Sequence, residues 1–306
     1  MWLKSHISCG LRFFCYFCKS IYPVMPYIVL MLYLAIALAL QFLMGDFPVS
    51  FFAFPLNVIV AVLWFGLMIW LWRNRKKSLF VSFMLSRGAT LCAITIFLLF
   101  GLVIGLTGLR SLVNTWVFVA FLLYFQTVLL FVIMRGWRAQ TATGAHLGEI
   151  RWRFILNHAG LLLAIAAPFW GAPDSETVRL QAFKDMPVRE AYRMDGTSVW
   201  MPYETELKEF RVETYSNGVP SMYEAELLIE GEPVALKVNH PYSKGFGENV
   251  YLTGYDAVAG EDTSYCIIQI VKEPWKYGAA AGIALMLAGA LLLFAAGPKK
   301  RYGEDD

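Results

Sequence analysis

The sequence predicts a polytopic α-helical membrane protein of about six spans, with an extracytoplasmic all-β, sandwich-like domain inserted between the last two spans. The 306 residues are 58% apolar and only 16% charged, with a mean hydropathy of +0.53, unlike a soluble domain. Several apolar stretches are long enough to cross roughly 30 Å of hydrocarbon. One polar block, residues 172–274, interrupts them and holds eighteen of the 23 acidic residues.

This pattern divides the chain into three parts. Residues 1–171 form a membrane domain with five spans, residues 172–274 form the β-domain, and residues 275–306 hold the last span and a short tail. The predicted spans, each about 20 apolar residues long, are 26–44, 51–72, 89–107, 114–134, 154–171 and 277–296. We expect the first span to be retained in the mature protein, because no small-residue cleavage pattern follows it.

Basic residues predict the orientation of the spans. With the N-terminus inside, the segments on the cytoplasmic side carry fifteen Lys and Arg residues, whereas the two short outer loops hold Arg110 alone. Lys and Arg near the ends of spans concentrate on the cytoplasmic side. We therefore expect both termini in the cytoplasm and residues 172–274 outside it.

The polar block has the pattern of antiparallel β-structure. Polar and apolar residues alternate so that Leu207, Phe210 and Val212 would face inward, and Glu230-Gly231-Glu232 is a hairpin signal. Short strands separated by turn residues favour a sandwich or a small barrel. Strands are expected within residues 204–214, 222–239, 249–256 and 264–272.

The cysteines do not predict a disulfide framework. Cys15 and Cys18 have the spacing of a redox or metal half-site, but no second pair accompanies them. We interpret them as interfacial cysteines, and redox or metal chemistry stays the alternative. Cys266 alone lies in the outer domain, where its place in a strand pattern predicts that it is buried.

Several short motifs follow one another in the outer block. They are Phe210 and Tyr215, Gly218-Val219-Pro220-Ser221, Val238-Asn239-His240-Pro241, Gly245 or Gly247, and Tyr251. In this order, between two spans, they resemble the ResB-like (CcsB-type) proteins of System II cytochrome c biogenesis. The resemblance covers roughly residues 150–297, and the first four spans only by hydropathy. Tyr242 and Leu252 depart from it, standing where the family commonly has Leu and Gln.

The resemblance implies a role in moving haem across the bacterial cytoplasmic (inner) membrane and presenting it for attachment to apocytochrome c. It also implies a CcsA-type polytopic partner with a Trp-rich motif, and thiol-reducing factors as further partners. No such motif occurs in this sequence, and we interpret Phe169 and Trp170 as an aromatic pair at the outer membrane interface. We therefore expect one component of a haem-lyase complex that is not catalytic alone.

His158 is the histidine that falls within a predicted span. It follows Arg153 by five residues, which places it roughly 7 Å inside the cytoplasmic boundary. A polar side chain at this depth is a functional candidate by default, and ligation of haem iron is one such use. The alternative is a packing histidine bonded to a neighbouring polar group such as Asn157. One histidine leaves the second axial ligand to a partner, or the iron five-coordinate.

Two further residues are candidates for contact with haem through a propionate or in support of His158. Arg151 lies seven residues before His158 on nearly the same helix face, and it can pair with a carboxylate. Its alternative role is that of a positive-inside anchor. Asn157 is the neighbour of His158 in sequence.

The motif residues of the outer block are expected to be structural. Asn tolerates left-handed backbone and Pro ends a strand, so turn formation explains most of them. For His240, contact with haem or substrate is the alternative. The set comprises Gly218, Pro220, Ser221, Asn239, His240, Pro241 and Tyr251.

The glycines of the last span and the absence of known catalytic motifs limit the classes of function that the sequence allows. In the last span, Gly278, Gly282 and Gly289 predict close helix packing, either within the chain or with a partner. The sequence has no phosphate-binding loop, dinucleotide fingerprint, zinc-type cluster or nucleophile elbow. The net negative outer domain disfavours nucleic acid. The alternative to haem delivery is a membrane-tethered extracytoplasmic binding or scaffold subunit without haem chemistry.

Overall fold

The computed structural model describes residues 25–75, 78–141, 151–217 and 220–296. The chain forms two compact units. One is helical and contains the residues up to Trp170 and those from Gly278 onward, and the other is the β unit, Gly171–Tyr277. The predicted positions Cys15, Cys18 and Gly218 lie outside the described residues.

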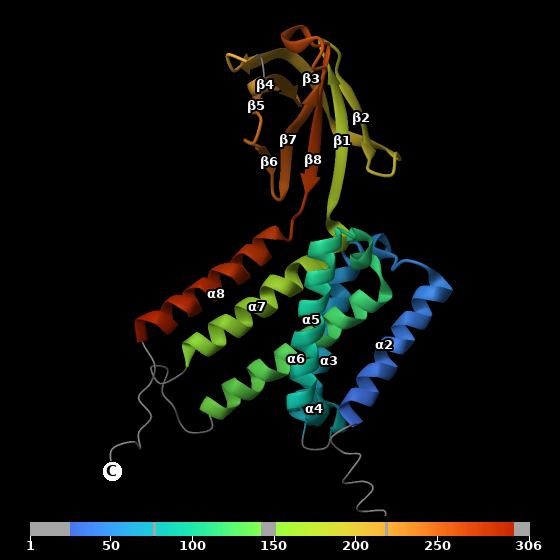
Figure 1. The fold of residues 1–306 in the computed structure, drawn as a ribbon, viewed down its shortest axis with the longest axis vertical. Coiled ribbons are helices and arrows are strands. Elements are labelled where there is room, and N and C mark those ends of the chain that lie inside the picture. Colours follow the sequence, from blue (N-terminus) through green and yellow to red (C-terminus); the bar gives the residue numbers. More distant parts are fainter. Residues whose placement is uncertain (1–24, 76–77, 142–150, 218–219, 297–306) are drawn as a thin grey trace, which may run out of the picture. The chain divides into compact units, whose positions relative to one another are not determined.

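The helical unit has a long apolar helix at each of the six predicted spans (Figure 1). Each of six helices is long and apolar enough to cross a membrane. Shorter helical turns connect some of them: η1 (Val49–Phe52), α4 (Leu79–Met84) and η2 (Arg110–Asn114). The long helices are α2 (Met25–Met44), α3 (Leu56–Arg73), α5 (Arg87–Thr107), α6 (Trp116–Thr141), α7 (Trp152–Gly171) and α8 (Lys276–Ala296).

Helix α6 carries much of the core of the helical unit. Phe121 and Phe131 are fully buried on it, and Phe121 packs against the ring of Phe100 on α5. The Tyr33 hydroxyl of α2 donates to the Ala120 carbonyl at 2.9 Å. In a membrane the hydrophobic effect does not drive helices together. Packed rings and buried hydrogen bonds to backbone carbonyls hold them in contact instead.

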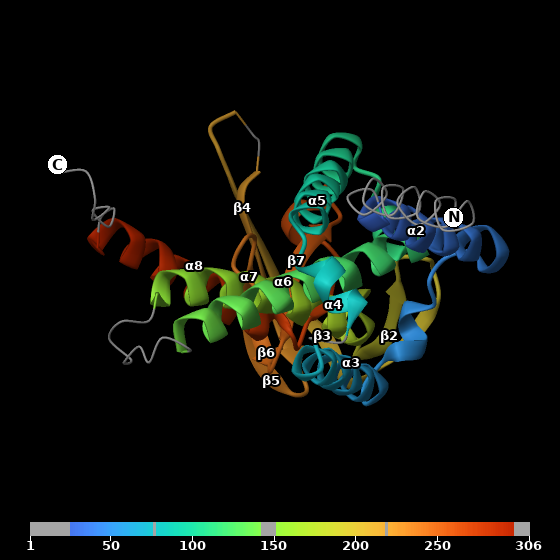
Figure 2. The ribbon, with the colours of Figure 1, turned by 90° about the horizontal axis from the view of Figure 1, so that it is seen from below.

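Helices α7 and α8 are neighbours (Figure 2). They pack at very short range through small residues. A Cβ atom on Gly282 would lie 2.4 Å from the Ala164 nitrogen and 2.7 Å from the Gly160 carbonyl oxygen. A Cβ atom on Gly289 would lie 2.6 Å from Nδ2 of Asn157. The glycine face predicted in the last span therefore packs within the chain, on α7.

The β unit is one eight-stranded antiparallel sheet in the order β5-β4-β3-β2-β1-β8-β7-β6. Strands β1 and β8 pair along their whole length, from Glu176 opposite Lys272 to Phe183 opposite Tyr265. The chain therefore enters and leaves the unit on neighbouring strands. The strands are β1 (Glu176–Phe183), β2 (Val188–Arg193), β3 (Ser198–Thr214), β4 (Pro220–Ile229), β5 (Glu232–Lys237), β6 (Tyr242–Gly245), β7 (Glu248–Tyr255) and β8 (Tyr265–Lys272).

The sheet curls so that its two halves share one core, which gives the sandwich-like form without a second sheet. Strands β3 and β7 are not neighbours in the sheet, yet the rings of Phe210 and Tyr255 lie 4.7 Å apart. Leu207 and Phe210 both point into the core, although strict alternation would place residues three apart on opposite faces. A register shift between Leu207 and Glu209 restores the inward face after the extra residue.

The strands predicted from alternation are present, and three more lie outside the predicted ranges. The hairpin at Glu230-Gly231 is confirmed, with φ of 56° and 81° at these two residues. Two successive residues with positive φ suit the right-handed twist of paired strands. Strand β1 does alternate, with Val178, Leu180 and Ala182 buried between polar residues. Strands β2 and β6 lack a clear alternation of apolar residues, and pairing with neighbouring strands defines them instead.

Candidate functional site

His158 lies in the second turn of α7, stacked against the ring of Phe154 one turn earlier. The ring centroids are 4.1 Å apart with an interplanar angle of 34°. The Nδ1 atom of His158 lies 2.9 Å from the Phe154 carbonyl oxygen. The side chain is half-buried in the isolated chain. Its ring is thus held on two sides by the preceding turn of its own helix.

This contact decides which nitrogen of His158 carries the proton. A carbonyl oxygen only accepts hydrogen bonds, so Nδ1 must be the donor. In the neutral imidazole, Nε2 then carries the lone pair, and no hydrogen bond to it is present among the described residues. A ring nitrogen anchored on a backbone carbonyl is a common way of orienting a histidine that ligates metal through its other nitrogen.

The Phe154 ring that supports His158 rests on α6. A Cβ atom on Gly136 would lie 2.3 Å from Cε1 of Phe154, so only glycine admits the ring in this position. Trp137 and Trp152 pack edge to face in the same region, with centroids 6.4 Å apart. The C-terminal end of α6 and the N-terminal end of α7 therefore pack together and support the Phe154 ring on which His158 rests.

The backbone at the start of α7 is also tied to α6. The backbone N–H of Arg151 donates to Oε1 of Gln140, and Nε2 of Gln140 donates to the Gly136 carbonyl at 3.0 Å. The Arg151 side chain is exposed. The backbone of Arg151 therefore ties the start of α7 to α6. Its guanidinium is exposed at the same end of the helix, one residue before α7 begins.

Asn157 points to a different neighbour from His158. Its Nδ2 donates to the Arg153 carbonyl at 2.7 Å, and its side chain meets Gly289 of α8. The polar group bonded to His158 is the Phe154 carbonyl and not the Asn157 side chain. On the described geometry Asn157 contributes to the α7–α8 contact, and its predicted support of a ligand stays a prediction.

The structure brings two of the outer motifs together at one end of the β4–β5 hairpin. The backbone N–H of Val238 donates to the Tyr223 carbonyl at 3.1 Å, two residues after Ser221. Asn239 has φ of 62°, the left-handed conformation expected of a turn-forming Asn. The His240 N–H donates to the Lys237 carbonyl at 3.1 Å, and its side chain is exposed. These contacts form the turn that follows β5, and the structural role of this motif stays a prediction.

The remaining motif residues are spread over other parts of the β unit. Pro220 begins β4, Ser221 and Pro241 are exposed, and Tyr251 is half-buried on β7. Phe210 is a core residue that packs on Tyr223 and Tyr255. All these positions belong to the β unit, whereas His158 belongs to the helical unit.

A buried polar cluster within the helical unit escaped the sequence analysis. The Trp170 indole donates from Nε1 to Oε1 of Gln126 at 3.1 Å, and its carbonyl accepts from Nδ2 of Asn57 at 2.9 Å. Gln126 and Asn57 are each 1% exposed. The Trp170 side chain is buried and bonded to α6, and its place at the outer membrane interface stays a prediction. Isolated polar residues in α3 and α6 were the available signal.

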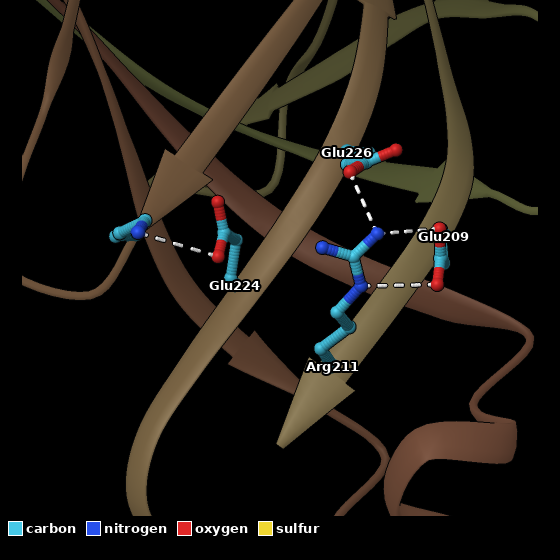
Figure 3. Close-up of polar contacts among 5 residues, drawn as sticks. Glu209, Arg211, Glu224 and Glu226 are labelled. Carbon is cyan, nitrogen blue, oxygen red and sulfur yellow. Dashed lines mark hydrogen bonds and ion pairs between the residues drawn. The ribbon is translucent and has the colours of Figure 1, made fainter. Parts of the chain in front are cut away.

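Paired charges cover the outward face of β3 and β4 (Figure 3). Arg211 donates from Nε and Nη2 to the two carboxylate oxygens of Glu209, at 3.0 and 2.9 Å, and also reaches Glu226 at 2.9 Å. Lys237 and Glu224 form a neighbouring pair at 3.5 Å. Part of the acidity of the β unit is thus neutralised within the sheet.

The comparison with protein families bears on the segment that contains His158 and the β unit. Residues 145–276 match the family model described as the ResB-like family. This part of the chain is similar to the ResB-like family. The match confirms the resemblance drawn from the outer motifs. In structural terms, the ResB-like segment contains α7, the whole β-sheet and the first residue of α8.

Two other comparisons complete the picture. A solved structure that is similar is described as cytochrome c heme lyase CcmF, with 12% sequence identity and a TM-score of 0.38. The similarity covers 56% of this chain and 30% of that one, so the chain spans less than a third of that protein. No curated protein matches the sequence.

Proposed function

We propose that this protein is a cytochrome c biogenesis subunit that helps carry haem across the membrane. With a CcsA-type partner, it presents haem for covalent attachment to apocytochrome c. The ResB-like match over residues 145–276 supports the role in cytochrome c biogenesis. The observation that carries the haem part of the proposal is the fixed ring of His158, whose Nε2 lone pair is left for a ligand.

The chemistry of the site suits haem iron. Neutral imidazole is a common axial ligand, and iron bound by it supplies a tether for the macrocycle. His158 is the only histidine in the described helices, so those helices offer one imidazole ligand for haem iron. Because the His158 ring is only half-buried, a partner protein has room to cover the opposite face of a haem bound to it. We infer that the second axial ligand comes from the CcsA-type protein.

The basic start of α7 suits the acidic edge of haem. Propionates pair with arginine through charge-assisted hydrogen bonds. The exposed guanidinium of Arg151 lies at the end of α7 from which the helix enters the membrane. Removing Arg151 should cost at most one such contact, on the order of 1.5–3 kcal/mol. Arg151→Ala should therefore lower haem retention less than His158→Ala.

The test is the absorbance spectrum of the chain purified with its CcsA-type partner. The wild-type complex should show a Soret band. His158→Ala should lose most of that band at nearly unchanged protein abundance, and added imidazole should partly restore it by filling the vacated coordination position. His240→Ala is the matched control, because His240 is an exposed turn residue of the β unit, and it should retain haem.

Three outcomes would contradict parts of the proposal. Full haem content in His158→Ala would return His158 to a packing role. A colourless wild-type complex would favour the tethered scaffold without haem chemistry. Covalent haem attachment by this chain alone, in a host without other maturation systems, would show that no partner is required.

A further inference from the structure

The turn between β6 and β7 carries an exposed aromatic residue beside the start of a membrane-spanning helix. Phe246 is 74% exposed, at the tip of a two-residue turn completed by Gly247. Its ring lies 4.8 Å from the ring of Tyr277, with an interplanar angle of 31°. Tyr277 is the second residue of α8, whose span runs over Lys276–Ala295.

The backbone holds this turn in place. The Glu273 N–H donates to the Gly247 carbonyl at 2.7 Å. Gly247 has φ of 77°, and a Cβ atom there would lie 2.6 Å from the Cα atom of Pro274. Only glycine therefore allows the turn to rest on the segment that leads into α8. The position of Phe246 beside α8 is built into the fold of the β unit.

Trp275, just before the start of α8, makes further contacts beside the Phe246 turn. The Trp275 indole donates to Oδ2 of Asp174 at 2.7 Å and covers Gly171, where a Cβ atom would lie 2.2 Å from the indole. Trp and Tyr concentrate where a membrane helix meets water, since their rings have an apolar body and a polar tip. Trp275 and Tyr277 thus mark the boundary, and Phe246 lies at the same level as Tyr277.

We propose that the Phe246 turn inserts into the interfacial layer of the membrane as a third contact of the β unit with the bilayer, besides its two helices. An exposed apolar ring gains free energy when it leaves water, and the nearest apolar medium is the lipid around Tyr277. The lysine in the preceding strand does not supply the attraction. Lys244 pairs with Glu230 at 2.8 Å and lies over the Tyr203 ring, so its ammonium group is already engaged within the β unit.

The loop at the other end of β7 offers a matched control. Val258 is an apolar residue that is 99% exposed, in the β7–β8 loop. Strand β7 has eight residues, which at about 3.3 Å per residue place this loop roughly 26 Å from the Phe246 turn. Both sites are exposed and apolar, but only one adjoins a membrane helix.

Site-specific photocrosslinking of the full chain in cell membranes tests the proposal. Benzoylphenylalanine replaces Phe246, Val258 or Tyr277 in turn, and adducts are identified by mass spectrometry. Phospholipid adducts are expected at positions 246 and 277 and should be absent at 258. Gly247→Ala combined with the probe at 246 should reduce the lipid adducts, because the turn can no longer rest on Pro274.

The same experiment identifies the results that would overturn the proposal. Lipid adducts at 277 without any at 246 would show that the turn stays in water. Adducts of position 246 with a polypeptide would show that a protein covers it instead. Repeating the experiment with the chain in vesicles of phosphatidylethanolamine and phosphatidylglycerol removes other proteins, and loss of the lipid adduct there would also refute direct insertion.

Discussion

Cys266 illustrates how a single residue is governed by its surroundings. It is fully buried on β8, as the strand pattern predicted. Burial disfavours the thiolate and raises the pKa of the thiol to about 12. In the unfolded chain the thiol ionises near pH 8.5. Ionisation of the unfolded state therefore makes the β unit less stable as the pH rises from about 9 toward 12.

This leads to a prediction about the reactivity of Cys266. The folded protein should be alkylated at Cys266 far more slowly than the denatured chain. A rise from about pH 8 to about pH 10 should accelerate the reaction in the denatured chain well before it does so in the folded one. Quantitative mass spectrometry of the peptide containing Cys266 measures both rates. Equal rates in the folded and denatured states would show that the thiol is accessible.

Arg211 provides a second prediction at the scale of the residue. Glu209 and Glu226 lie directly opposite each other on β3 and β4, and Arg211 bridges them (Figure 3). Its hydrogen bonds and charge hold the pKa of Glu209 below its usual range. The stabilisation is therefore present at neutral pH and disappears as the pH falls through the lowered pKa.

Arg211→Gln should lower the thermal stability of the β unit slightly at neutral pH, because two carboxylates would then face each other without a cation. The difference from wild type should disappear at an acidic pH well below the lowered pKa of Glu209, where that carboxylate is protonated. Arg189→Gln is the control, since Arg189 pairs with a single carboxylate, that of Glu204, and it should have a smaller effect. A loss that is equal at both pH values would contradict this account.

At the scale of the element, the contact between α7 and α8 depends on small residues. Gly282→Val would place side-chain atoms against the backbone of α7 at Ala164 and Gly160. These are backbone atoms, which cannot shift without displacing the helix. Overpacking of this kind typically costs about 1–3 kcal/mol. The variant should unfold at a lower temperature in detergent. Because α7 carries His158, it should also reduce haem retention in the complex.

A glycine elsewhere in the membrane domain serves as the control for this prediction. Gly105 lies within α5, and a Cβ atom there would meet no other atom within 4 Å. Gly105→Val should therefore be close to neutral apart from helix propensity. Similar losses in the two variants would indicate a general intolerance of β-branched residues in these helices and not a specific close contact.

At the scale of the whole molecule, the orientation of the chain is a prediction from its basic residues. Six spans with both termini in the cytoplasm place the β unit outside. Gly196 lies in an exposed turn between β2 and β3, with open space around it, and tolerates a fusion. Alkaline phosphatase should be active when fused at Gly196 and inactive at Gly303. The reverse result would refute the orientation.

Local features of the sequence determined the six spans, because the length of an apolar stretch is a property of neighbouring residues. The hairpin at Glu230-Gly231 and the burial of Cys266 were likewise predicted from nearby residues. The position of His158 along its helix was set by its spacing from Arg153. In each case the information lies within a few residues of the feature, so it can be read without knowing what the chain packs against.

Only the tertiary structure decided the pairing of β1 with β8 and the bond from the Trp170 indole to Gln126. It also placed Phe154 between His158 and Gly136, and Phe246 beside Tyr277. Each of these contacts joins residues far apart in the chain, except that of Phe154 with His158, which depends on the distant residue Gly136. Their partners are selected by the packing of whole elements, since a buried polar group must find a partner wherever the fold provides one.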